Sequence, residues 1–306
     1  MSLTLLQGTL EQGLIYSLVA LGLFLSFRIL NVADLTVDGG FTLGCAVSAV
    51  ATLAGHPILG LFMALIAGSL AGGVTALLQT KLKVPSILAG IITMTALYSI
   101  NLMIMGNRAN VPLLKKDTVY TMAAQWLPGP YTKLIVITVI VLIVSLLMLL
   151  FLKSGAGLSV RATGDNPDLV RSSSINPEWT ITLGLCIANA LVSLSGAMLA
   201  QYQLYSEITT GTGMVVIGLA SLIIGEAIIG RGSMIRCIIG TMVGSIIYRL
   251  IIAFAITTSL SASNLKLISA IIVALSISWP AIKEKIELAR LKRNAKKDLN
   301  SSSRED

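Results

Sequence analysis

The chain alternates between long apolar stretches and short polar interruptions. A transmembrane helix needs about 20 mostly apolar residues, and about nine stretches meet this length. They run near 13–30, 35–54, 57–79, 85–105, 132–152, 179–201, 211–229, 235–257 and 265–282. The pattern predicts an all-α fold, a polytopic transmembrane helix bundle of about nine spans. The range is roughly 8–10 spans, because Asp34 and Asp38 crowd the start of the second stretch.

Composition agrees with a membrane protein. Of the 306 residues, 55% are hydrophobic and only 12% are charged, whereas soluble domains carry about 25% charged residues. The net charge of +8 would suggest nucleic acid as the partner of a soluble protein. Here the lipid bilayer is the expected surrounding, the placement of the charges matters more than their sum, and no nucleic-acid partner is expected.

The basic residues are distributed unevenly between the two sides that nine spans would create. If residues 283–306 form a basic cytoplasmic tail, 16 of the 22 Lys and Arg fall on the cytoplasmic side. Such asymmetry is typical of membrane proteins. It predicts a transmembrane domain over residues 1–282, an outside N-terminus and a cytoplasmic C-terminus. Residues 1–13 lack a basic region and a cleavage site, so no removable signal peptide is expected.

The most polar interruption is RATGDNPDLVRSSSINP, residues 161–177. It cannot lie in hydrocarbon. A turn over 163–167, with Asn166 or Asp165 as helix cap and Pro167 at the first helical position, predicts a short helix over 168–174. Leu169 and Val170 would form its apolar edge, which needs cover from a partner or from the loop itself. We interpret the segment as a docking surface for a soluble partner; the alternative is a plain turn.

Motifs for catalysis and metal binding are absent from the sequence. It contains no G-x-x-x-x-G-K-[ST], H-E-x-x-H, C-x-x-C or G-x-S-x-G pattern. Cys45, Cys186 and Cys237 lie in or beside apolar stretches, where a free thiol behaves as a small hydrophobic group. We therefore expect no catalytic residue, no metal site and no cofactor on this chain.

The polar segment also resembles a known family. Residues 161–176 are similar to the coupling segment of importer-type ABC permeases of the branched-chain amino acid and ribose class. The likeness continues over NALVSLSGAMLAQYQ (189–203), IGLASLIIGE (217–226) and NVADLTVDGGFTLG (31–44), and as a set it covers nearly the whole chain. The two-acid form DLTVDGGFTLG resembles a smaller subgroup associated with uptake of the aromatic amino acids tryptophan and tyrosine.

The resemblance implies a type II-like ABC importer permease fold and a place in the bacterial cell (plasma or inner) membrane. Implied partners are a second permease copy, cytoplasmic ATP-binding subunits that hold ATP and Mg, and an extracellular or periplasmic solute-binding protein. Residues 1–282 would be the permease domain, with a cytoplasmic coupling loop over 153–178. The residues implied to contact the ATPase are Gly164, Asp165, Asn166, Pro167, Asp168, Leu169, Val170, Arg171, Ser172 and Ile175.

The expected function is ATP-driven import of a small polar solute. We expect this solute to be an amino acid, and we favour an aromatic one. The alternative is an ion-coupled secondary transporter that acts without an ATPase, and a membrane scaffold or receptor is a third class. Candidates for the translocation path are the polar residues within apolar stretches: Tyr98, Asn101, Asn189 and Arg249.

Other interpretations of these polar residues stay open. The amide and phenol groups can instead hydrogen-bond across helices, and Arg249 can snorkel to the surface or form a structural pair. Three acids are expected at the inner side in structural or gating roles. Asp34 and Asp38 would cap the second span, and Glu226 would pair with Arg161 or Arg231.

Overall fold

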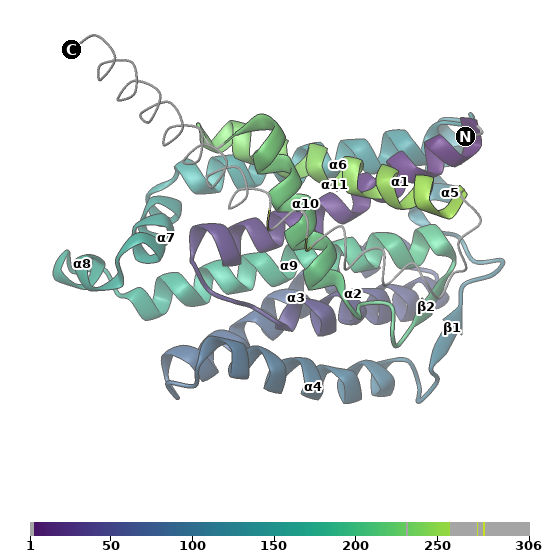
Figure 1. The fold of residues 1–306 in the computed structure, drawn as a ribbon. Coiled ribbons are helices and arrows are strands. Elements are labelled where there is room, and N and C mark those ends of the chain that lie inside the picture. Colours follow the sequence, from purple (N-terminus) through teal and green to yellow (C-terminus); the bar gives the residue numbers. More distant parts are fainter. Residues whose placement is uncertain (1–2, 231, 258–273, 275–277, 279–306) are drawn as a thin grey trace, which may run out of the picture.

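The computed structural model describes residues 3–230, 232–257, 274 and 278. Its regular structure is mostly helical, as the sequence predicts, and the long helices lie side by side in one bundle (Figure 1). These helices are α1 (Leu3–Leu23) with its π-helical continuation η1 (Phe24–Ile29), α2 (Thr36–Leu53), α3 (Pro57–Thr80), α4 (Ser86–Ile104), α6 (Thr132–Lys153), α9 (Pro177–Gln203), α10 (Met214–Ile229) and α11 (Met234–Thr257).

Seven helices in the described part of the chain are long and apolar enough to cross a membrane. They match seven of the predicted spans, although the first begins at Thr4 rather than near residue 13. The predicted span at 211–229 is wrong in length, because it forms only α10, with 16 residues. At 1.5 Å per residue α10 is roughly 24 Å long, shorter than the hydrocarbon core of about 30 Å. Of the predicted span at 265–282 the structure describes only residues 274 and 278, and the predicted tail at 283–306 lies outside the described residues.

Small residues allow the central helices to approach one another closely. A Cβ atom on Gly68 or Gly72 of α3 would overlap the backbone carbonyl of Asn189 or Leu185 in α9. The same holds where Gly244 of α11 meets the carbonyl of Ser221 in α10. Lipid offers no hydrophobic drive for helix association, so close van der Waals contact between such faces stabilises the bundle. Gly68 and Gly72 therefore mark the contact of α3 with α9, and Gly244 marks the contact of α11 with α10.

The two ends of the bundle differ. At one end lie α7 (Gly155–Asp165), α8 (Pro167–Ser172) and the turn between α3 and α4 (Figure 1). At the other end lie α5 (Val119–Trp126) and a two-stranded antiparallel sheet of β1 (Asn110–Pro112) and β2 (Tyr205–Glu207). Val111 pairs with Ser206 in this sheet, so the fold contains a small β element that the all-α prediction omitted.

The outer helices present apolar side chains to their surroundings. α6 has the highest mean hydropathy of the seven spanning helices, 3.4, and Leu142, Leu146 and Leu147 on it are exposed. α3 exposes Phe62 and Ile66 in the same way. These faces suit contact with lipid or with another apolar helix surface.

Candidate functional site

The polar segment folds as a short capped helix at one end of the bundle. Asn166 Oδ1 accepts hydrogen bonds from the backbone N–H groups of Asp168 (3.1 Å) and Leu169 (3.0 Å), and Pro167 begins α8. The predicted cap and first residue are therefore confirmed. The predicted turn over 163–167 is too long, because α7 continues to Asp165 and the chain turns only at Asn166.

The end of α7 is held in place by two contacts. Gly164 packs on the carbonyl of Ile29, where a side chain would overlap it. Thr163 Oγ1 lies 2.7 Å from Thr180 Oγ1 of α9. These two contacts hold residues 163–165 in the helix, although their composition predicts a turn.

The predicted apolar edge of α8 is split between inside and outside. Leu169 is 63% exposed, whereas Val170 is only 2% exposed and belongs to the core. The sequence cannot separate the two, because adjacent residues of a helix point about 100° apart and only the packing decides which is covered. The remaining predicted coupling residues are exposed or half-buried: Gly164, Asp165, Asn166, Pro167, Asp168, Arg171, Ser172 and Ile175.

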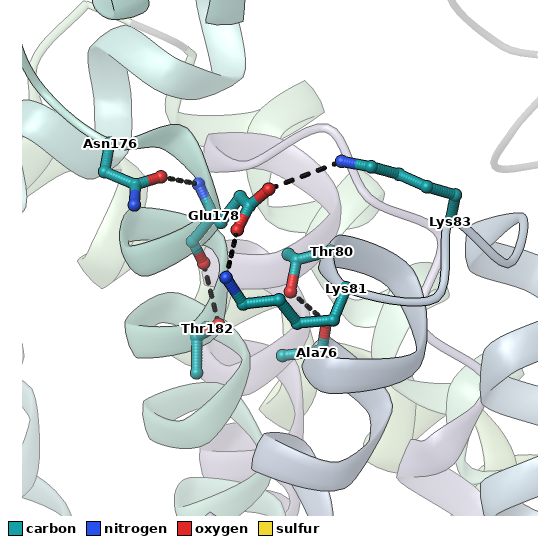
Figure 2. Close-up of polar contacts among 7 residues, drawn as sticks. All are labelled: Ala76, Thr80, Lys81, Lys83, Asn176, Glu178 and Thr182. Carbon is teal, nitrogen blue, oxygen red and sulfur yellow. Dashed lines mark hydrogen bonds and ion pairs between the residues drawn. The ribbon is translucent and has the colours of Figure 1, made fainter.

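An ion-pair cluster beside α8 joins two neighbouring elements, and the sequence analysis did not identify it. The Glu178 carboxylate in the first turn of α9 contacts Lys81 Nζ at 2.7 Å and Lys83 Nζ at 3.4 Å (Figure 2). Asn176 Oδ1 caps the same turn by accepting from Glu178 N–H at 2.9 Å. The start of α9 is thereby attached to the turn between α3 and α4. The sequence did offer a signal for this cluster, because Lys81 and Lys83 follow one predicted span and Glu178 precedes another.

Asp34 and Asn189 form a buried link between α9 and the start of α2. Asp34 Oδ1 accepts from Thr36 N–H (2.9 Å), and Oδ2 accepts from Asn189 Nδ2 (2.7 Å). Burial raises the pKa of the Asp34 carboxyl, while the hydrogen bonds from Thr36 and Asn189 oppose that rise. Asp34 accepts the N–H of Thr36, the first residue of α2, although Leu35 rather than Asp34 is the N-cap residue, and Asn189 acts as a hydrogen-bond donor from α9.

Asp38 caps a different helix from the one predicted. Its Oδ2 accepts from Gly213 N–H (2.8 Å) and its Oδ1 accepts from Val215 N–H (2.9 Å), at the start of α10. The first N–H groups of α10 have no acceptor within their own helix and need another one, which Asp38 of α2 supplies. The expectation that Asp38 caps the second span is therefore wrong.

Asp38 also lines a cavity of about 310 Å³ between α2, α4 and the segment before α10. Two of the predicted path residues, Tyr98 and Asn101 of α4, line the same cavity. Asn101 Nδ2 donates to the Gly39 carbonyl at 3.2 Å, and its buried Oδ1 has no hydrogen-bond partner among the described residues. The complete lining is Asp38, Gly39, Thr42, Met94, Thr95, Tyr98, Asn101, Ile208 and Thr212.

The other polar candidates lie elsewhere. Arg249 of α11 hydrogen-bonds to Gln12 Oε1 and lies over the Tyr16 ring, 5.3 Å from its centre. It lines a separate cavity between α1 and α11, and these contacts match the structural-pair interpretation. Asn189 is fully buried and does not line the Asp38 cavity.

Glu226 forms an ion pair at the α8 end of the bundle. The structure shows Arg28 as its partner, with Arg28 Nε 2.9 Å from Glu226 Oε1. Arg161 is not part of this ion pair, and Arg231 lies outside the described residues. Within the described ranges, no group of three or more His, Cys, Asp or Glu could hold a metal ion.

Comparison with known proteins identifies the class of protein. The family model described as the permease component of a branched-chain amino acid transport system matches residues 5–277, and the chain belongs to this family. It is a multi-pass membrane permease.

Two relatives resemble this chain over most of its length. A tyrosine transport system permease protein of Clostridioides difficile (strain R20291) is 36% identical over 87% of this chain and 88% of its own. An uncharacterised protein of Rickettsia prowazekii (strain Madrid E) is 33% identical over 90% of this chain and 98% of its own. No solved structure matches the chain.

Proposed function

We propose that this chain is the membrane-spanning subunit of an ATP-driven ABC importer that moves an amino acid, with aromatic side chains favoured, into a bacterial cell. Its partners would be a second permease copy, cytoplasmic ATP-binding subunits and an external solute-binding protein. ATP and Mg would bind to the partner subunits. The proposal rests mainly on one observation, the capped helix α8 with Leu169 exposed at one end of a family permease.

A contact at α8 would reach the spanning helices through short connections. Two hydroxyl groups, Thr163 of α7 and Thr180 of α9, lie 2.7 Å apart. Glu178 attaches the same end of α9 to the α3–α4 turn. A soluble subunit that pushes on α8 would therefore shift α9, which packs against α1, α2 and α3. Such a bundle can alternate between two arrangements if the partner binds them with different affinity.

The proposed substrate class follows from the relative and the cavity. The similar Clostridioides difficile protein is described as a tyrosine transport system permease. The Asp38 cavity combines polar groups with Tyr98, Met94 and Ile208, a mixture typical of sites for small molecules with both polar and apolar parts.

The test is reconstitution of the permease with its ATP-binding and solute-binding partners in proteoliposomes, with uptake of labelled L-tyrosine as the readout. ATP-dependent uptake is expected. Leu169→Asp should reduce uptake by about 10-fold or more and release the ATP-binding subunit during purification, because it places a charge in an apolar contact. Val170→Asp is unsuitable, since Val170 is buried in the core.

Leu114→Asp is the matched control. Leu114 is also exposed, at 70%, but lies beside β1 at the opposite end of the bundle. This variant should retain the ATP-binding subunit. Full ATP-driven uptake by Leu169→Asp would refute the coupling role of α8. Uptake driven by an ion gradient with no ATPase present would instead favour the secondary-transporter class.

A further inference from the structure

The wall of the Asp38 cavity carries one acidic side chain, that of Asp38 itself, among the lining residues. Both Asp38 oxygens accept backbone N–H bonds, which is the pattern of an ionised carboxylate. Among the described residues, no Lys or Arg forms an ion pair with it. Its charge is offset by the amide dipoles at the start of α10, and each oxygen retains a lone pair for a further donor.

The wall contains a second acceptor, the side-chain oxygen of Asn101. Asn101 is 1% exposed, and its Oδ1 has no partner in the described part of the chain although its Nδ2 is satisfied by Gly39. A buried acceptor without a donor costs about 1–3 kcal/mol, so a ligand that supplies the donor would gain this free energy. The Tyr98 ring and the side chains of Met94 and Ile208 provide the apolar part of the lining.

We propose that this cavity binds the primary ammonium group of an amino acid, with Asp38 as its counter-ion and Asn101 Oδ1 as a second acceptor. The Tyr98 ring would lie beside the ammonium group or the aromatic side chain of the ligand, both of which aromatic faces attract. The inference rests on the proposed function, because it names the group by which the importer would hold its substrate inside the membrane. It gives Asp38 a second role beyond capping α10.

The first experiment measures the charge of the cavity without requiring transport. Thr95→Cys places a thiol on the cavity wall, where Thr95 is exposed and its hydroxyl bonds only to its own helix. The native residues Cys45, Cys186 and Cys237 are replaced by Ser. The complete transporter in lipid nanodiscs is treated with a cationic and an anionic methanethiosulfonate reagent of similar size, and the two rates are compared with those of a free thiol.

The cationic reagent should be favoured by about 10-fold, because a negative charge on the wall of a cleft raises the local concentration of cations. Asp38→Asn should remove this preference while keeping an oxygen that can cap α10, and Asp38→Glu should retain it. Asp34→Asn is the matched control: it removes a nearby buried carboxylate that does not line the cavity, so the preference should persist. An unchanged preference in Asp38→Asn would overturn the proposal.

A second experiment leaves Asp38 intact and so does not depend on the folding of its variants. L-Phenylalanine, phenethylamine and 3-phenylpropionate are compared for their ability to slow labelling of Thr95→Cys by a neutral thiol reagent. The two compounds with an ammonium group should slow labelling by about 3-fold or more near saturation, and the acid without it should not. Equal protection by all three, or protection by none, would contradict ammonium binding.

The two proposals can fail separately. Lack of ATP-dependent amino acid uptake by the reconstituted wild-type transporter would refute the proposed function, whatever the labelling shows. Normal uptake together with charge-independent labelling would refute only the assignment of the cavity.

Discussion

At the scale of single residues, Gly72 shows how little space separates α3 from α9. A Cβ atom there would overlap the Leu185 carbonyl, which is backbone and cannot rotate away. Gly72→Ala should therefore lower stability by about 1–3 kcal/mol, the usual cost of overpacking. Gly73→Ala is the control, because its Cβ would meet only Cys186 Sγ at 3.4 Å, an ordinary contact. Thermal unfolding in detergent measures both; equal midpoints would contradict the close packing.

The Asp34–Asn189 hydrogen bond leads to a second residue-scale prediction. Asn189→Leu removes the donor from a buried carboxylate and should destabilise the protein by about 1–3 kcal/mol. The double variant Asp34→Leu/Asn189→Leu should be less destabilised than the sum of the two single variants, because it leaves no unpaired charge. The unfolding midpoints of the wild type, the two single variants and the double variant form a double-mutant cycle. If the two single effects on stability simply add in the double variant, the two groups do not interact.

At the scale of elements, the attachment of α9 to the α3–α4 turn is electrostatic and exposed to solvent. Glu178→Gln should lower the unfolding temperature slightly, since exposed ion pairs contribute little. Salt should cancel the effect, because the screening length falls to about 3 Å at 1 M. The experiment compares wild type and Glu178→Gln at low and high salt, with Glu207→Gln, an acid at the opposite end, as the control. A difference that persists in 1 M salt would assign Glu178 another role.

The helices differ in how far the sequence can predict them. Asn166 and Pro167 identify the start of α8, because capping depends on a few adjacent residues. The length of α10 was not predictable in this way. Its apolar residues continue to the expected end, but the helix starts late because Asp38, far away in sequence, accepts the N–H groups of Gly213 and Val215. Contacts between distant segments override the local pattern.

The same limit applies to the candidate site. Polar residues in apolar stretches were recognisable as unusual, and Tyr98 and Asn101 do line one cavity because they lie one turn apart on α4. Asn189 and Arg249 are also polar residues within apolar stretches, but their side chains link neighbouring segments of the bundle. Only the packing shows which polar group faces a cavity and which faces a neighbouring helix.

At the scale of the whole molecule, basic residues are unevenly placed along the bundle axis. Among the described residues, the loops and helix ends on the side of α5 and β1 carry Arg108, Lys115, Lys116 and Lys133. The helix ends and turns on the side of α7 and α8 carry Arg28, Lys81, Lys83, Lys153, Arg161, Arg171 and Arg236. Because basic loops are retained in the cytoplasm, we expect α8 to face the cytoplasm, where an ATP-binding subunit could reach it.

The orientation is tested with two single-cysteine variants in a chain that carries Cys45→Ser, Cys186→Ser and Cys237→Ser. Ser172→Cys lies on exposed α8 and Gly129→Cys on the exposed loop at the opposite end. A membrane-impermeant thiol reagent should label Gly129→Cys in intact cells and Ser172→Cys only in inverted membrane vesicles. Because the two positions lie at opposite ends of one bundle, each serves as the control for the other. Labelling of Ser172→Cys from outside the cell would place α8 beyond the reach of any cytoplasmic subunit and remove the physical basis of coupling to ATP.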